Sequence, residues 1–158
     1  MELCRLAIKV FDLDEGTKRK VYKDSKGFWT IGRGHLIGNS LESLELPPAV
    51  IEALFQHDLG IAIYAARRIF GNQFFDQQLP ARQMAIVSMI FTLGEAGFRG
   101  FDETIEQIKA ENWDNVAERI LKTKWARDID PRQREGFGRD DRISFMFKTG
   151  DFHPEYKI

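Results

Sequence analysis

Residues 15–37 read EGTKRKVYKDSKGFWTIGRGHLI and contain the clearest structural signals in the chain. Two β-forming runs, Val21–Tyr22 and Phe28–Ile31, flank the tetrapeptide Asp24–Gly27. Asp in the first position and Gly in the last position are typical of a type I turn. The pattern therefore predicts a β-hairpin. A loop at Gly32–His35 is expected to close it, because its two glycines allow the backbone to bend.

A helical pattern precedes this hairpin. Leucine, alanine and valine recur at intervals of three and four within residues 2–14, which predicts an amphipathic helix. Gly16 is a favourable helix terminator, so Glu15 is expected at the C-terminal end of that helix. The negative end of the helix dipole disfavours a charged carboxylate and favours its protonated form. The plainer interpretation is that Glu15 is a solvated charge at a helix end.

Helical patterns dominate the rest of the chain. Pro48 suits the first turn of a long helix over about 48–70. Residues 81–93 are almost entirely apolar, which predicts a buried central helix. Asp102 is a candidate N-cap for the next helix. Further helical patterns cover residues 102–108, 113–125 and 143–147.

Together these patterns predict an α+β fold with two lobes within a single domain, residues 1–158. A small β-hairpin lobe (about 16–46) would be joined by the long helix (about 48–70) to a larger helical lobe, residues 1–15 plus 71–158. The apolar face of the N-terminal helix needs cover that the small lobe cannot supply, so we expect this helix to pack on the helical lobe. The cleft between lobes is the expected binding site.

Composition limits the possible functions. The 158 residues carry a net charge of −1, which argues against nucleic-acid binding and against attraction to anionic membranes. Cys4 is the single cysteine, so no internal disulfide is expected. No export signal is recognisable, and no run approaches the roughly 18 apolar residues of a spanning helix, so membrane insertion is not expected. His57 and His153 lack metal-ligand spacing, so we expect a monomer with no metal and no cofactor.

Glu15 and Asp24 are positioned to face each other across the predicted cleft. Glycoside hydrolysis uses such a pair, in which one carboxylic acid protonates the leaving oxygen and one carboxylate activates water or attacks the sugar. Thr30, across the hairpin, offers a hydroxyl that can hold a water beside Asp24. Each residue also has a plainer interpretation: Asp24 can bond its own turn backbone, and Thr30 can be an ordinary strand residue. The hypothesis rests on the three residues together.

Residues 14–37 closely resemble the signature of the T-even phage lysozyme family, glycoside hydrolase family 24. Further similarity covers most of the chain, at Phe91–Gly97, Trp113–Asp114, Lys124–Trp125 and Phe147–Gly150. The resemblance implies a lysozyme-like fold and a peptidoglycan muramidase that cuts the β-1,4 bond between N-acetylmuramic acid and N-acetylglucosamine with inversion. It also implies that Glu15 is the general acid, and that Asp24 is the general base acting on a water held with Thr30.

The resemblance implies further roles outside the catalytic set. Substrate contacts carry over to Gly34, Leu36, Phe91, Thr104 and Arg119, and the last departs from the family pattern, which has Asn there. Three supporting residues carry over as well. Arg139 is expected to approach Glu15, and His35 is expected to pair with Asp58 on the long helix.

The resemblance leads to a phage endolysin that degrades the host wall. Such a protein is expected to accumulate in the host cytoplasm and to reach the periplasm and cell wall through lesions made by a separate holin. Three alternatives remain open: a tail-associated lysozyme used at infection, a lytic transglycosylase and a non-catalytic wall-binding module. The presence of Asp24 and Thr30 argues against the transglycosylase, and the presence of Glu15 argues against the binding module.

Overall fold

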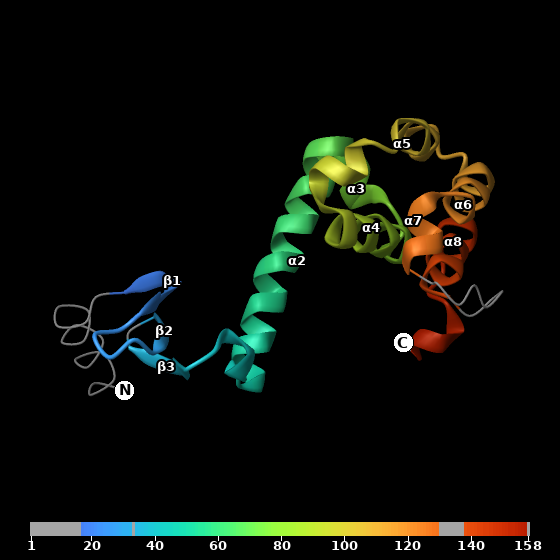
Figure 1. Ribbon diagram of the computed structural model, residues 1–158. Helices are drawn as coiled ribbons and strands as arrows, with labels where there is room; N and C mark the ends of the chain where they lie inside the picture. The colour runs from blue at the N-terminus through green and yellow to red at the C-terminus, as the bar shows by residue number, and fades with distance from the viewer. Residues whose placement is uncertain (1–16, 33, 130–137, 158) are drawn as a thin grey trace. The chain divides into compact units, whose positions relative to one another are not determined.

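The computed structural model describes residues 17–32, 34–129 and 138–157 (Figure 1). These residues form a three-stranded antiparallel sheet and seven α-helices, so the fold is α+β as the sequence predicts. The helix expected over residues 2–14, and Glu15 with it, lie outside the described residues. The chain divides into two compact units, Met1–Glu52 and Ala53–Ile158.

The sheet of the first unit has the order β1-β2-β3. Its strands are β1 (Lys18–Lys23), β2 (Trp29–Gly32) and β3 (His35–Gly38). The predicted hairpin is therefore confirmed, but the expectation that His35 belongs to a loop is wrong. Gly32 and Gly34 have φ of +69° and +80°, which reverses the chain. The β-formers that follow then pair with β2, with Thr30 opposite Leu36 and Ile31 opposite His35.

A polar connection leads from the sheet to the long helix. It contains a short 3-10 helix, Leu41–Ser43, whose first turn is capped by the Ser40 hydroxyl, which accepts the Glu42 N–H at 3.2 Å. Helix α2 (Pro48–Phe70) then has the predicted bounds. It ends at Gly71, whose φ of +84° is favourable only for glycine, and whose N–H donates to the Arg67 carbonyl at 2.8 Å.

Helix α2 is long and largely apolar. Among the described helices it alone is by itself long and apolar enough to cross a membrane, with a mean hydropathy of 1.2 over its best window. Polar residues interrupt it, so it is no continuous apolar run. Ala62, Ala65, Ala66 and Phe70 of α2 are buried, but only 17% of the apolar window is buried within the described structure.

Six helices follow α2: α3 (Asn72–Gln77), α4 (Pro80–Arg99), α5 (Asp102–Lys109), α6 (Trp113–Leu121), α7 (Lys124–Ile129) and α8 (Arg139–Thr149). The apolar helix predicted over 81–93 is confirmed but extends to Arg99, with a kink at Gly94 (φ 69°, ψ 164°). Asp102 lies in the first turn of α5, and Phe101 holds the N-cap position, so the predicted cap is wrong.

The pattern over residues 113–125 is split into α6 and α7 at Thr123. The Thr123 hydroxyl donates to the Ile120 carbonyl at 2.7 Å and accepts the Ala126 N–H at 3.1 Å. One side chain therefore ends α6 and begins α7. This is the local bonding by which threonine competes with a continuous helix.

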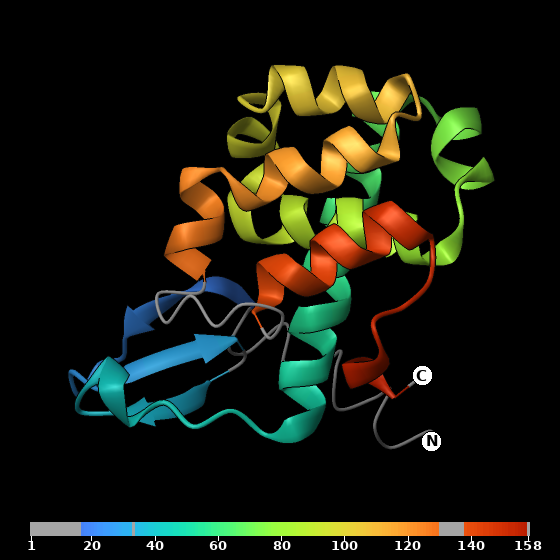
Figure 2. The same cartoon turned by 90° about the vertical axis from the view of Figure 1, so that its right-hand side faces the viewer.

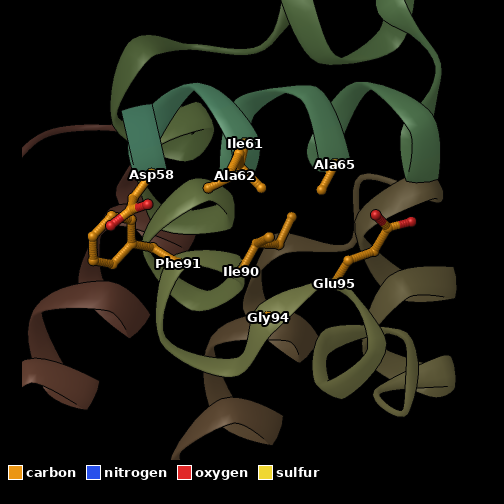
Figure 3. Close-up of a pocket in the computed structure, with 8 residues that line it drawn as sticks. All are labelled: Asp58, Ile61, Ala62, Ala65, Ile90, Phe91, Gly94 and Glu95. Atoms are coloured by element: carbon orange, nitrogen blue, oxygen red, sulfur yellow. The ribbon is translucent and has the colours of Figure 1, made fainter. Parts of the chain in front are cut away.

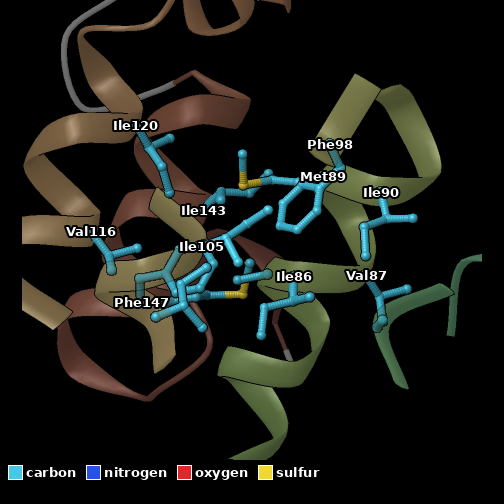
Figure 4. Packing of buried hydrophobic residues seen from close by; sticks show 14 of the residues in the cluster. Ile86, Val87, Met89, Ile90, Phe98, Ile105, Val116, Ile120, Ile143 and Phe147 are labelled. Atoms are coloured by element: carbon cyan, nitrogen blue, oxygen red, sulfur yellow. The ribbon is translucent and has the colours of Figure 1, made fainter. Parts of the chain in front are cut away.

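The core of the second unit lies among α4, α5, α6 and α8 (Figure 4). Figure 2 shows α6 and α8 side by side, and they make the most extensive helix–helix contact of the described elements. Phe98 and Phe147 are the largest fully buried side chains. Gly150 ends α8 at φ +78°, and a Cβ there would lie 2.5 Å from Leu79 Cδ1. Only glycine therefore lets the chain leave α8 against the start of α4.

Candidate active site

Asp24 is held by the turn that joins β1 to β2. Its Oδ1 accepts the backbone N–H groups of Lys26 and Phe28, each at 2.9 Å. The turn is closed by the Gly27 N–H, which donates to the Asp24 carbonyl at 3.0 Å. The turn bonding that is the plainer interpretation of Asp24 is thus present, but it uses one carboxylate oxygen. No residue that the structure describes donates to Oδ2, so this oxygen remains available to an external donor.

Thr30 lies in the central strand on the same face of the hairpin as Asp24. Tyr22 pairs with Thr30, and the Asp24 N–H donates to the Phe28 carbonyl at 2.9 Å. Side chains alternate along strands, so positions 24, 28 and 30 share a face. Thr30 is 3% exposed, and its hydroxyl donates to the Phe28 carbonyl at 3.2 Å. Because its own proton is engaged, the hydroxyl oxygen can accept a hydrogen bond from water.

The other predicted residues of the first unit follow β2. Gly34 has φ +80°, and a Cβ at this position would meet nothing within 4 Å. Glycine is therefore required by backbone conformation and not by space. Leu36 is 59% exposed and pairs with Thr30 across the sheet, so it presents an apolar side chain directly beside the threonine. His35 is exposed on the same strand.

Phe91 and Asp58 line a cavity of about 240 Å³ between α2 and α4 (Figure 3). Asp58 and Phe91 lie at one end of this cavity and Glu95 lies at the other, with Ile90 and alanines of α2 between them. The Phe91 ring is 5.9 Å from the Phe55 ring, centroid to centroid. Phe91 is 41% exposed, which suits an aromatic residue that contacts a sugar ring at the wall of an open apolar hollow.

Thr104 and Arg119 come together in a second cavity of about 470 Å³, although fifteen positions separate them in the sequence. Thr104 is buried on α5, and Arg119 extends from α6 to form an ion pair with Glu103. The Arg119 Nε is buried and has no hydrogen-bond partner among the described residues. The cavity thus combines a hydroxyl, a guanidinium and a carboxylate, a set that can bind polar groups of a peptide or a sugar.

One residue of this second cavity, Glu103, was not predicted from the sequence. Glu103 pairs with Arg119, and Lys124 supplies a further cation at the cavity wall. The sequence shows an acidic pair at the start of α5, but carboxylates are common in the first turn of helices in general. The sequence does not reveal that Glu103 also pairs with Arg119, because only the packing of α5 on α6 brings the two side chains together.

Arg139 begins α8 and donates from Nη2 to the Ser88 hydroxyl of α4 at 2.9 Å. The guanidinium is therefore anchored within the second unit. Its expected approach to Glu15 stays a prediction, because Glu15 lies outside the described residues. The pairing of His35 with Asp58 also stays a prediction, since the two residues belong to different units. Over residues 17–32, 34–129 and 138–157, no group of three or more His, Cys, Asp or Glu side chains is arranged to hold a metal ion.

The sequence of this chain is similar to a known protein family and to several known proteins. The profile of the family described as Phage lysozyme matches residues 13–138. The "Probable T4-type lysozyme 2" of Dictyostelium discoideum is 26% identical over 167 residues, covering 91% of this chain and 94% of the relative. The endolysin of Salmonella phage P22 is 30% identical over 145 residues, covering 85% and 94%.

A third relative is part of a larger protein. The pre-baseplate central spike protein Gp5 of Enterobacteria phage T4 is 24% identical over 163 residues, which cover 87% of this chain but 27% of the spike protein. The family match, by contrast, spans most of the present chain and includes the turn of Asp24 and the strand of Thr30. This protein therefore belongs to the phage lysozyme family of glycoside hydrolases.

Proposed function

We propose that this protein is a muramidase that hydrolyses the β-1,4 bond between N-acetylmuramic acid and N-acetylglucosamine in peptidoglycan, with inversion at the anomeric carbon. The observation that carries the proposal is the arrangement of Asp24 and Thr30 in a chain of the phage lysozyme family. One carboxylate oxygen of Asp24 is fixed by the turn, the other is available, and Thr30 lies two positions along the same face from the turn residue Phe28.

In this proposal Asp24 is the general base. A water donates one O–H to Asp24 Oδ2 and the other to Thr30 Oγ1, which leaves an oxygen lone pair free to attack the anomeric carbon. As the new C–O bond forms, Asp24 takes the proton of the water. The backbone donors of Lys26 and Phe28 keep Oδ1 in place, so that the carboxylate is already oriented before substrate binds.

Glu15 is the general acid in the same proposal. It protonates the glycosidic oxygen as the bond to the sugar breaks, and the leaving sugar departs as a neutral alcohol. Inversion requires room for a water between the sugar and the base, and therefore a separation of roughly 6.5–9.5 Å between the two carboxyl groups. Gly34, Leu36 and Phe91 are proposed to contact the glycan, and Thr104 and Arg119 are proposed to contact polar groups of the substrate.

We propose the biological role of an endolysin. The protein would accumulate in the host cytoplasm, pass through holin lesions and act on the cell wall from the inside as a monomer. A tail-associated lysozyme is the second candidate, and the similarity to the T4 central spike protein favours it. Expression with and without a holin separates them, because an endolysin lyses cells only when the holin is present.

The experiment that tests the chemistry is digestion of purified Gram-negative sacculi in water enriched in oxygen-18, with mass analysis of the products. We expect muropeptides that end in reducing muramic acid and carry one heavy oxygen. Glu15→Gln and Asp24→Asn are each expected to slow their release by about 10²–10⁴-fold. Glu118→Gln, which neutralises an exposed carboxylate of α6, serves as the matched control and should retain activity.

Other products would point to other functions. Anhydro-muramic products without heavy oxygen, still released by Asp24→Asn, would make the protein a lytic transglycosylase. A folded protein that binds sacculi but releases nothing would be a wall-binding module. Proton NMR of the first product distinguishes inversion from retention, since inversion of a β bond yields the α anomer first.

A further inference from the structure

The first strand of the sheet and the turn after it carry a concentration of positive charge that the proposed chemistry does not use. Five cations, Lys18, Arg19, Lys20, Lys23 and Lys26, fall within nine positions, and Asp24 is the one acidic residue among them. These five are part of a total of 23 basic residues, against 24 acidic ones. The remainder of the chain is therefore acidic on balance. The net charge of −1 conceals a local basic surface, here called the basic strand.

All five side chains of the basic strand are exposed. Within the described part of the chain, none of them forms an ion pair with a carboxylate. In the second unit, by contrast, ion pairs with Asp or Glu engage Arg67, Arg68, Arg99, Lys109, Arg119, Lys122, Arg142 and Lys148. Among the described residues, the basic strand is thus a run of exposed cations with no carboxylate partner, whereas many cations of the second unit are paired.

The geometry of β1 suits an extended ligand. β1 is an edge strand, and its six residues extend over roughly 17–20 Å. β1 pairs with β2 at Lys18 and again at Tyr22, and the register is irregular between these two positions, so the cations are spread along an irregular edge. Aromatic rings support two of the ammonium groups: Lys18 Nζ is 3.8 Å from the Tyr22 ring centroid, and Lys23 Nζ is 5.3 Å from that of Trp29. Exposed charges spread along an edge match a polymer that offers many anionic groups.

We propose that the basic strand binds the carboxylates of peptidoglycan stem peptides and holds the wall against the sheet. The proposal rests on the proposed function, since it takes peptidoglycan as the substrate. A peptidoglycan mesh repeats free carboxylates along its glycan strands, which complements a row of cations. Lys23 and Lys26 flank Asp24 in the chain, so a strand held here lies beside the turn that carries the general base.

Each ion pair between a cation of the basic strand and a wall carboxylate is expected to be weak, but several such pairs can form on one polymer. An exposed ion pair is weak and is screened by salt. Several such pairs on one polymer act together, because the first contact raises the local concentration of the next carboxylate. Weak individual contacts also let the protein move to a new bond after each cleavage. The binding should therefore weaken steeply as ionic strength rises.

The basic strand also has a simpler possible role. Lysines on an edge strand prevent the edges of two sheets from pairing, which protects a protein from aggregation. In that case removal of the charges would cause self-association and would leave wall binding unchanged. The two roles therefore predict opposite results in the same variant.

The experiment compares two triple variants of equal charge in co-sedimentation with purified sacculi. K18Q/R19Q/K20Q removes three charges of the basic strand. K109Q/K148Q/K157Q removes three exposed charges from the second unit. Both are made in the Glu15→Gln background so that the sacculi are not digested. We expect the strand variant to bind about tenfold more weakly at low salt, the change corresponding to three exposed ion pairs, and the control to stay within about twofold.

Two further arms identify the ligand. On sacculi whose carboxylates have been capped with a neutral amine, the difference between the two variants should vanish. Equal weakening of both variants would overturn the proposal, as would an undiminished difference on capped sacculi. A loss seen on anionic phospholipid vesicles or on DNA, but not on sacculi, would also overturn it. Light scattering must show the strand variant as monomeric as its parent, and self-association with unchanged binding would establish edge protection instead.

The outcome is independent of the chemistry proposed for Glu15 and Asp24. Sedimentation reports binding, whereas product release by the unmodified protein reports hydrolysis. A protein that binds through the basic strand but releases no muropeptides would refute the proposed catalysis and retain this inference. Release of muropeptides by a protein whose binding does not depend on the basic strand would support the proposed catalysis and refute this inference.

Discussion

Asp24 allows its structural role and its catalytic role to be separated by two substitutions. Oδ1 accepts the N–H groups of Lys26 and Phe28 at 2.9 Å each, and no described residue donates to Oδ2. Asp24→Asn keeps an acceptor oxygen at the position of Oδ1 and removes the charge. Asp24→Ala removes the acceptor as well. Both variants lack a general base, but only the alanine variant loses the bonds that hold the turn.

The expected stability changes follow from these two hydrogen bonds. A hydrogen bond to a charged group contributes about 1.5–3 kcal/mol when its partner would otherwise stay unsatisfied. Lys26 is exposed and Phe28 is half-buried, so water replaces part of what Asp24→Ala removes. We therefore expect Asp24→Ala to lower the free energy of unfolding by about 1–3 kcal/mol. Asp24→Asn should cost about 1 kcal/mol or less, because neutral hydrogen bonds are roughly half as strong.

Asp24→Asn and Asp24→Ala are expected to lose the same amount of activity, although they differ in stability. Loss of a general base lowers the rate by about 10²–10⁴-fold, so both variants should release muropeptides more slowly by that factor. Urea unfolding followed by circular dichroism measures stability, and product release from sacculi measures the rate. Ser25→Ala, an exposed position in the same turn, is the control and should shift stability by less than about 0.5 kcal/mol.

Two results would contradict the roles given to Asp24. If Asp24→Asn unfolds as easily as Asp24→Ala, the two backbone bonds do not hold the turn as the structure indicates. If Asp24→Asn keeps the rate of the unmodified protein, Asp24 is a turn residue and not the base. The first result concerns only the structural role of Asp24 and the second only its catalytic role, because stability and rate are measured separately.

Three further predictions concern the second unit. Gly150→Ala should lower the free energy of unfolding by about 2–4 kcal/mol in urea titration, since it combines a left-handed φ of +78° with a contact of 2.5 Å to Leu79; an unchanged midpoint would show that this contact relaxes freely. Phe147→Ala should cost about 3–5 kcal/mol in the same assay, because the ring is 0% exposed, and a loss below 1 kcal/mol would contradict its place in the core. Glu103→Gln should lower KM for sacculi, because it releases Arg119 from its ion pair. Arg119→Gln should raise KM. If both variants shift KM in the same direction, a substrate contact by Arg119 is excluded.

Much of the first unit could be predicted from the sequence because its determinants are local. The turn at Asp24–Gly27 depends on an Asp that bonds its own backbone and on a Gly at φ +84°. The spacing from Asp24 to Thr30 then places both on one face, since the register follows from the turn. The third strand was missed because Gly32 and Gly34 indicate a bend but not what the chain does after it.

Helix ends were predictable where a single residue determines them. Pro48 begins α2 as predicted, because proline restricts φ, and Gly71 ends it because glycine permits a positive φ. Asp102 was misassigned by one position, since the N-cap depends on backbone angles that its neighbours decide. Thr123 split a continuous apolar pattern because its hydroxyl bonds the backbone on both sides, which hydrophobic periodicity does not register.

Local sequence patterns were sufficient to predict the hairpin, the candidate base with its threonine, the long helix and the family, since each depends on residues close together in the chain. The folded structure was needed to show that Thr104, Glu103 and Arg119 share one cavity, that Arg139 bonds Ser88, and that Gly150 packs against Leu79. These contacts join residues far apart in sequence, and packing of whole helices brings them together. Local propensity and periodicity contain no information on which distant helix a side chain will meet, so that part of the site had to come from the fold.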